Sequence, residues 1–359
     1  MRALLLSPEL FLAEGGIARI MRLYLKALCE IAGPGGRVDS VVLNDAQSVD
    51  PRLAGYTDGR TGEHVGCNRG RFRFIRHTLR LSRQADHLVC AHLHQFPIAW
   101  LAAKFNPKLK YHLVAHGIEV WRPYGLLERR SLLGAHRILC VSEYTRRQML
   151  RFCPGLDAAR LVVLPNTLDP HFAPGPAAPP AAAAFDLPRI LSVGRLSRAD
   201  AYKGFDLLIE ALPLIRRDYP AVRLRIVGQG DDQPRLADLA ARLGVSDRVD
   251  FLGPVDDTAL AAEYAACDLF ALPSRREGFG LVYLEAMAYG KPCIGARAGG
   301  VPEVITDSVG QLVEYGDLAG LAAAVSDLVQ HRRAADDVRA HAAMFAFPRF
   351  AGRLAAFLV

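Results

Sequence analysis

Two glutamates lie eight positions apart in an otherwise apolar stretch of the sequence. Residues Leu281 to Tyr289 are apolar on nearly every side, which predicts a buried helix that ends at Gly290. Glu285 falls inside this helix, where a carboxylate needs hydrogen-bond donors or a positive partner. It could receive the hydroxyls of a ligand, or it could pair with a core arginine or a backbone group.

Glu277, the other glutamate, precedes the same helix in a glycine-rich turn. Gly278, Phe279 and Gly280 form the turn and Leu281 begins the helix, so free backbone N–H groups there can bind an anion such as a phosphate. The stretch therefore predicts an anion site with a carboxylate at each end. Such a site suits a sugar nucleotide, with sugar hydroxyls at one glutamate and ribose hydroxyls at the other.

Two cations follow a predicted strand at residues 189–194. Arg195 can hold two phosphate oxygens at once, and Lys203, at the start of the next helical segment, adds a point charge. Both lie at the carboxyl end of the strand, so they could stabilise a departing diphosphate. The alternative is a pair of surface cations neutralised by local acids such as Asp200 and Asp206.

Three residues of the first half could contact a ligand. Gly15 and Gly16 enter a helix directly after the first strand, where paired glycines allow close backbone approach, although they could serve helix–strand packing alone. His116 ends the strand at 111–116, and its imidazole could donate to a sugar hydroxyl or a developing charge. Neither Gly15–Gly16 nor Gly228–Gly230 completes a dinucleotide-binding pattern.

We expect no metal site. Four histidines at positions 92, 94, 112 and 116 lie on two predicted strands, but no nearby acid completes a ligand set. The chain also has no D-x-D triplet that could hold a divalent ion against a diphosphate. The expected charge neutralisation therefore comes from Arg195, Lys203 and the helix N-terminus at Gly280.

Short strand-like runs alternate with helical patterns along the whole chain, which predicts parallel sheets in two tandem doubly wound α/β domains. The boundaries follow from composition, since residues 173–188 are rich in proline and alanine. We expect an N-terminal domain at 1–168, a linker at 169–188, a second domain at 189–335 and a helical tail at 336–359. Two such domains facing each other would hold a ligand in the cleft between them.

The composition is that of a globular protein without membrane spans. Of 359 residues, 51% are hydrophobic and 23% charged, no apolar run reaches about 20 residues, and the N-terminus lacks a signal-peptide pattern. Seven scattered cysteines form no C-x-x-C pair, which fits the reducing cytoplasm. The net charge of +7 favours an anionic partner.

An arginine-rich stretch at residues 68–86 is predicted to be helical. Five arginines would then form one basic stripe with apolar neighbours, and they are Arg69, Arg73, Arg76, Arg80 and Arg83. This stripe could rest on an anionic membrane surface or be a solvated face. Nucleic acid is not the expected partner, because no aromatic stacking platform is evident.

Four motifs in the second half resemble the retaining glycosyltransferases of family 4, which have the GT-B fold. They are GRL…KG at 194–204, EGFGLVYLE at 277–285, GKP at 290–292 and GGVPEV at 299–304. The resemblance is looser in the first half, where it rests on the paired glycines, on His116-Gly117 and on LPN at 164–166. There the family continues with glycine and this chain has Thr167.

The resemblance implies a role for each candidate residue. Arg195 and Lys203 would hold the donor's diphosphate, Glu285 the ribose, and Glu277 with the turn up to Gly280 the transferred sugar. His116 would contact that sugar, and the C-terminal tail would return to the first domain. These roles imply retaining, metal-independent transfer of a hexose, mannose or glucose from GDP-mannose or UDP-glucose.

The acceptor implied by the family is a saccharide, and the basic stripe points to a lipid-linked one in exopolysaccharide or lipopolysaccharide synthesis at the inner membrane face. Two other functions remain open. An epimerase acting on the sugar nucleotide would need no acceptor. A non-catalytic sugar-nucleotide-binding subunit would keep the two cations without turning over the donor.

Overall fold

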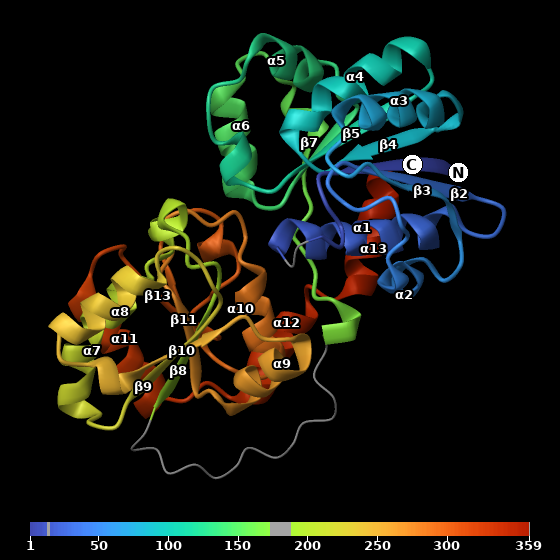
Figure 1. The fold of residues 1–359 in the computed structure, drawn as a ribbon. Coiled ribbons are helices and arrows are strands. Elements are labelled where there is room, and N and C mark those ends of the chain that lie inside the picture. The colour runs from blue at the N-terminus through green and yellow to red at the C-terminus, as the bar shows by residue number, and fades with distance from the viewer. Residues whose placement is uncertain (13–14, 173–187, 359) are drawn as a thin grey trace. The chain divides into compact units, whose positions relative to one another are not determined.

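The computed structural model describes residues 1–12, 15–172 and 188–358, which divide into two units. Unit 1 comprises Met1–Asp169 with Ala346–Val359, and unit 2 comprises Pro170–Phe345. Each unit contains one parallel sheet with helices on its faces (Figure 1). The predicted doubly wound α/β architecture is confirmed.

The sheet of unit 1 has seven strands in the order β3-β2-β1-β4-β5-β6-β7, and every neighbouring pair is parallel. The strands are β1 (Arg2–Ser7), β2 (Arg37–Val42), β3 (Thr61–Gly66), β4 (His87–Cys90), β5 (Lys110–Ala115), β6 (Arg137–Cys140) and β7 (Leu161–Val163). The central strands are buried except at the first residue of β1 and of β5, as their nearly continuous runs of apolar residues require for a sheet covered on both faces.

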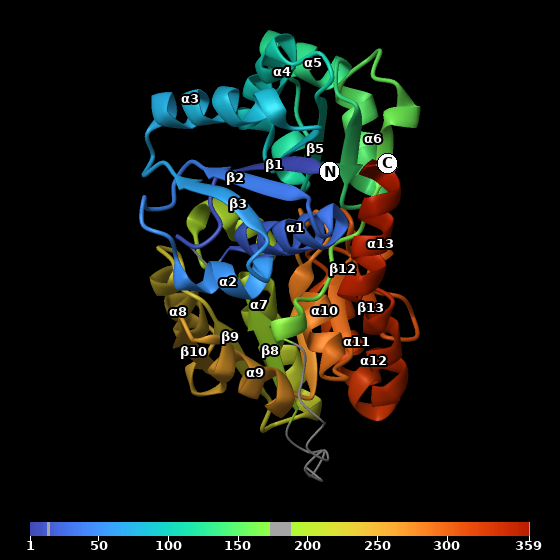
Figure 2. The ribbon, with the colours of Figure 1, turned by 90° about the vertical axis from the view of Figure 1, so that its right-hand side faces the viewer.

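Among the described residues, seven helices belong to unit 1. They are α1 (Gly16–Ala32), α2 (Ala54–Thr57), α3 (Arg71–Leu81), α4 (Phe96–Phe105), α5 (Leu126–Leu133), α6 (Glu143–Phe152) and α13 (Phe347–Leu358). Helices α1 and α13 pack together on one face of the sheet, where the rings of Tyr24 and Phe350 meet edge to face at 4.9 Å. Helices α3, α4 and α5 lie side by side on the other face (Figures 1 and 2).

The sheet of unit 2 has six parallel strands in the order β10-β9-β8-β11-β12-β13. They are β8 (Arg189–Val193), β9 (Arg223–Val227), β10 (Val249–Gly253), β11 (Leu269–Leu272), β12 (Cys293–Ala296) and β13 (Gly310–Val313). Its helices are α7 (Phe205–Asp218), α8 (Gln233–Arg242), α9 (Asp257–Ala266), α10 (Leu281–Ala288), α11 (Leu318–Gln330) and α12 (Ala335–Ala343). Aspartate caps start two of them, since Asp256 accepts a hydrogen bond from Ala259 and Asp317 accepts one from Gly320.

The structure differs from the expected organisation in two places. Strand β3 was not predicted, because its sequence TGEHVG has glycines and charge where strand patterns have apolar residues, and it pairs only along one edge of the sheet. The tail was expected from residue 336, whereas α12 still belongs to unit 2 and the chain joins unit 1 only from Ala346. Most of the expected linker, residues 173–187, lies outside the described residues.

The arginine-rich stretch is helical over α3, but the five-arginine stripe is partly wrong. Arg69 precedes the helix with a left-handed φ of 64°, so it cannot share the helix face. Arg73, Arg76 and Arg80 are exposed on α3, and Arg83 is exposed in the 3₁₀ turn that follows. Arg80 is also paired with Glu63 of β3, so its charge is partly neutralised.

Two histidines are buried together at the amino ends of β4 and β5. Nδ1 of His87 and Nε2 of His112 are 3.2 Å apart, and the two rings stack with their planes 17° apart. Burial, followed by the charge of Lys110, lowers the pKa of His87 to about 4. Burial also lowers the pKa of His112 well below its usual value. Both rings are therefore neutral at physiological pH.

This histidine pair makes unit 1 sensitive to acid. The unfolded chain, with a histidine pKa near 6.5, binds more protons than the folded state, so stability is full above pH 6.5 and falls as the pH drops toward 4. We expect His87 to contribute a loss of about 1–2 kcal/mol at pH 5. Urea unfolding at pH 7.5 and pH 5 measures the loss, which His87→Asn should reduce. The exposed His331→Gln is the control, and an equal loss in both variants would contradict the assignment.

Candidate functional site

The predicted residues of unit 2 meet at one edge of its sheet. Strands β8 and β11 are neighbours, and from them the strand order runs in opposite directions, which makes their carboxyl ends the position where open α/β sheets bind ligands. Arg195 and Lys203 follow β8, and Glu277 follows β11. The fold thus places the two cations and the carboxylate at the same switch point.

Lys203 and Glu277 form an ion pair at this edge. The ammonium Nζ lies 3.6 Å from Oε2 of Glu277, and the two side chains are only 19% and 20% exposed. The lysine stem passes close to the backbone at the end of β8, where a Cβ on Gly194 would be 3.6 Å from Lys203 Cδ. Partial burial strengthens the attraction between these charges relative to a surface pair.

Arg195 is held differently. Its Nε donates to Oδ2 of Asp200 at 2.5 Å, and the hydroxyl of Tyr202 donates to the other carboxylate oxygen at 3.0 Å. Asp200 is buried, whereas the arginine side chain is 73% exposed. Arg195 therefore pairs with a local acid through Nε, while most of its side chain stays exposed. Lys203 pairs with Glu277 instead of Asp206.

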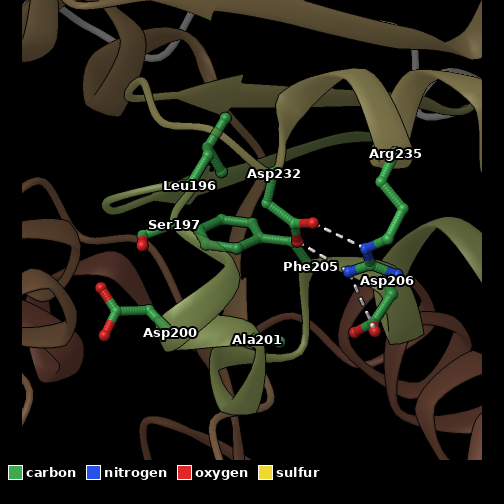
Figure 3. A pocket seen from close by; sticks show the side chains of 8 residues that line it. All are labelled: Leu196, Ser197, Asp200, Ala201, Phe205, Asp206, Asp232 and Arg235. Atoms are coloured by element: carbon green, nitrogen blue, oxygen red, sulfur yellow. Dashed lines mark hydrogen bonds and ion pairs between the residues drawn. The ribbon is translucent and has the colours of Figure 1, made fainter.

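A small hollow lies beside this loop, between the 3₁₀ turn at Arg198–Lys203 and the start of α8 (Figure 3). Figure 3 shows Arg235 bonded to Asp232, with Nε and Nη2 each 2.7 Å from a carboxylate oxygen, and reaching Asp206 at 3.5 Å. Hydrogen bonds to Asp232 raise the pKa of Arg235. These ion pairs brace α7 against α8 beside the hollow.

The turn at Glu277 is fixed through its backbone. The carbonyl of Glu277 accepts a hydrogen bond from the N–H of Gly300 at 2.8 Å. Gly299 has φ of +60°, and a Cβ there would lie 2.4 Å from the Glu277 carbonyl oxygen. The glycine pair after β12 therefore lets two backbones touch, which positions the glutamate.

The turn continues into α10 through glycine and a buried ring. Gly280 is left-handed at φ +90°, and a Cβ there would collide with the ring of Tyr283. Phe279 is buried against Phe345, with ring centroids 5.6 Å apart, and Gly278 is buried too. No side chain caps α10, whose first residue is the half-buried Leu281. Its first backbone N–H groups can therefore serve an anion.

Glu285 is buried within α10, as predicted, at 8% exposure. The hydroxyl of Tyr264, on α9, donates to its Oε2 at 2.9 Å. Tyr264 is itself fully buried and stacks on Tyr289 at 5.8 Å. The partner that sequence reasoning missed is thus a tyrosine, and no sequence spacing connects Tyr264 to Glu285 because the contact is between two helices.

In unit 1, a residue that was not predicted holds the chain at residues 10–12, after β1. Asp45 is buried and accepts hydrogen bonds from the backbone N–H groups of Leu10, Phe11 and Leu12 at 3.0–3.2 Å. Gly15 is the N-cap of α1 in extended geometry. The sequence feature that could have indicated this role is an acidic residue directly after the second predicted strand. The loop follows β1, which lies next to β4 in the sheet. The strand order runs in opposite directions from these two strands, so their carboxyl ends form the switch point of the first sheet.

His116 follows β5 at the same edge of the first sheet. Its backbone N–H donates to Oε1 of Glu119 at 2.6 Å, and Gly117 turns the chain with φ +139°. Burial, reinforced by His92, lowers the pKa of His116 to about 3, and burial raises that of Glu119. Within the described residues, Nε2 of His116 is buried without a hydrogen-bond partner. A neutral imidazole with an open nitrogen is suited to a ligand hydroxyl.

The described residues contain neither a cluster of metal ligands nor a helix that could span a membrane. No group of three or more histidine, cysteine, aspartate or glutamate side chains among them is arranged to hold a metal ion. Within residues 1–12, 15–172 and 188–358, no helix has both the length and the apolar character needed to cross a membrane. All seven cysteines lie in this part of the chain, buried and without disulfides.

The chain matches two protein families, one in each unit. Residues 15–172 match the family described as Glycosyltransferase Family 4, and residues 187–331 match the one described as Glycosyl transferases group 1. These matches cover the glycine turn and His116 in the first half, and the two cations and both glutamates in the second.

Curated relatives align over part of their length. A GDP-mannose-dependent alpha-(1-6)-phosphatidylinositol monomannoside mannosyltransferase from Mycobacterium tuberculosis is 36% identical over 255 residues, 66% of this chain and 65% of that protein. A D-inositol 3-phosphate glycosyltransferase from Geodermatophilus obscurus is 36% identical over 64% of this chain and 53% of its own length. The chain therefore spans less than two thirds of these relatives.

Solved structures share the fold. The Anabaena protein HepE, crystallised in complex with UDP, superimposes with a TM-score of 0.77 over 99% of both chains at 21% identity. At that identity the likeness concerns the fold alone, and it extends over both units.

Proposed function

Since the chain belongs to glycosyltransferase family 4, with the GT-B fold, we propose that it transfers a hexose from a nucleoside-diphosphate sugar to a saccharide hydroxyl with retention of anomeric configuration. The observation that carries the proposal is the Lys203–Glu277 pair at the β8/β11 switch point. A sugar nucleotide offers two kinds of group for recognition, a diphosphate and sugar hydroxyls. The cation complements the diphosphate, and the carboxylate accepts hydrogen bonds from the hydroxyls.

The proposed chemistry is departure of the diphosphate. When the bond from the sugar carbon to the phosphate oxygen breaks, its electron pair stays on the oxygen and the negative charge there grows. Lys203, Arg195 and the first N–H groups of α10 stabilise this charge, while Glu277 holds the hydroxyls of the oxocarbenium-like sugar. The departing phosphate takes the proton of the attacking acceptor hydroxyl. A glycoside and a nucleoside diphosphate result, without a divalent ion.

The remaining candidate residues take supporting roles. Glu285 of α10, bonded to Tyr264, is the residue that the family resemblance places at the ribose hydroxyls. Gly15 and Gly16 give the donor room beside α1. His116 donates to or accepts from a sugar hydroxyl as a neutral ring, because its low pKa excludes an imidazolium at physiological pH.

The relatives guide the choice of donor and acceptor. The Mycobacterium tuberculosis relative is named for GDP-mannose and HepE was crystallised with UDP, so GDP-mannose and UDP-glucose are the donors to test first. We propose a lipid-linked saccharide acceptor at the cytoplasmic face of the membrane, in exopolysaccharide or lipopolysaccharide synthesis. The basic residues of α3 support this acceptor class.

A panel of GDP-, UDP- and ADP-sugars tests the proposal by thermal stabilisation. A donor at about 100 times its Kd should add about 2.7 kcal/mol, and the same donor should be consumed only when a saccharide acceptor is present. Activity should survive a chelator. Loss of activity with the chelator would contradict the metal-independent chemistry. Conversion of the donor to its epimer without acceptor, or binding without any turnover, would replace the transferase by one of the other two functions.

A further inference from the structure

The positive charge of the chain is concentrated in one segment of unit 1. Residues 67–136 contain nine arginines and three lysines against three acidic residues, a net charge of about +9, which exceeds the +7 of the whole chain. The rest of the molecule is therefore slightly acidic, so the +7 reflects this segment alone. It contains α3, α4 and α5, three of the helices on one face of the first sheet (Figure 1).

The same segment also carries the exposed apolar side chains. Among the described residues, ten large hydrophobic side chains are exposed, and six of them belong to this segment, namely Phe72, Leu101, Phe105, Leu126, Leu127 and Leu133. Phe72 is 90% exposed and Leu126 is 80% exposed. Six of ten in about a fifth of the chain is far more than an even distribution would give.

The helices explain why charge and apolar side chains share one side. Helix α3 turns Phe74, Thr78 and Leu81 inward, which leaves Arg73 and Arg76 pointing outward. Phe72 lies beside them at the N-terminal end of the helix. Helices α3 and α4, and α4 and α5, pack against each other, so their outer sides form one layer (Figures 1 and 2).

Helix α5 repeats the pattern. Leu126 and Leu127 are exposed at its first turn, followed by the exposed Arg129 and the arginine at position 130. On α4, Phe105 is exposed next to Lys104, whose ammonium lies 5.3 Å from the centre of the Trp100 ring. Each of the three helices therefore combines at least one outward apolar side chain with an adjacent cation.

We propose that the outer side of α3, α4 and α5 docks onto an anionic lipid bilayer, with the arginines at the headgroups and Phe72 and Leu126 entering the acyl boundary. Charge complementarity selects an anionic partner, and exposed aliphatic side chains gain more from acyl chains than from water. Nucleic acid uses basic surfaces too, and Phe72 and Phe105 could stack on bases, but the four exposed leucines of this surface have no ring to stack and favour acyl chains. The inference rests on the proposed function in one respect: docking would bring a lipid-linked acceptor in the bilayer near the enzyme.

Vesicle sedimentation of the full chain tests this surface. The protein should bind vesicles containing about one third phosphatidylserine, bind phosphatidylcholine alone weakly, and dissociate in about 1 M salt. R73E/R76E should weaken binding at least tenfold, whereas the matched control R217E/R242E, on exposed positions of unit 2, should bind like the wild type. F72S/L126S should weaken binding several-fold with no change in charge.

The outcomes separate this surface from the proposed function. Turnover of a water-soluble acceptor analogue should be unchanged in all three variants. If the wild-type chain binds vesicles but has no transferase activity, the proposed function is contradicted and the docking surface is not. The docking surface is overturned by absent vesicle binding or by equal losses in R73E/R76E and the control. It is also overturned if F72S/L126S binds lipid like the wild type, or if single-stranded RNA binds more tightly than vesicles.

Discussion

Glu277→Gln lowers kcat by about 10²–10³-fold and leaves the KM for the donor within a few-fold. The amide keeps the shape of the side chain but removes the charge that pairs with Lys203 and that, in the proposed mechanism, accepts hydrogen bonds from the sugar. Because this charge acts on the oxocarbenium-like sugar, the loss falls on the chemical step. Steady-state kinetics with donor and acceptor, together with thermal unfolding of each variant, provides the measurement.

Two further variants serve as a control and as a test of the pair. Glu314→Gln removes a carboxylate that is 70% exposed and paired with Arg297, so its turnover should stay at the wild-type value. Lys203→Met should lower kcat as strongly as Glu277→Gln, and the double variant should lose less than the two single losses combined, because the pair acts as a unit. Unchanged turnover in a folded Glu277→Gln protein would remove this residue from the mechanism.

Gly299→Ala lowers kcat by about 10–100-fold in a protein that still folds. The added Cβ would lie 2.4 Å from the Glu277 carbonyl oxygen and 3.1 Å from its backbone nitrogen, so the turn must shift. A displacement approaching 1 Å at a group that positions substrate is enough for a loss of this size. Kinetics and urea unfolding should therefore show a catalytic defect larger than the loss of stability explains.

Gly316→Ala separates the steric effect from backbone strain. Gly316 is left-handed at φ +90°, like Gly299 at +60°, but a Cβ on Gly316 meets nothing within 4 Å. Both variants should lose about 1–2 kcal/mol of stability from the left-handed backbone, and only Gly299→Ala should lose turnover. Equal kinetics for the two would mean that contact with the Glu277 backbone is not needed.

Local patterns in the sequence predicted what local interactions determine. The helix at Leu281, its end before Gly290 and the burial of Glu285 all follow from the spacing of apolar residues and glycines, and α10 has these features. The approach of Lys203 to Glu277 was predictable only in part. Strand alternation placed both at carboxyl ends, but that β8 and β11 are neighbours comes from the sheet order.

The missed features depend on contacts between distant segments. Strand β3 has no apolar alternation and forms by pairing with β2, so its register comes from the sheet. Asp45 and Tyr264 find their partners about 35 and 21 positions away, across a loop and between helices. Arg69 was predicted in the basic stripe but lies outside α3, because the left-handed residues before the helix set its start, which arginine spacing does not reveal.

The burial of the ammonium at position 203 has a consequence for how tightly a dianion can be held. About four fifths of this side chain is already covered, so most of its hydration shell is removed when the chain folds and not when a guest arrives. An incoming dianion then only has to displace the carboxylate of Glu277 from the ammonium, and little water is released from the lysine itself. The entropy gained on binding should therefore come mainly from the dehydration of the dianion.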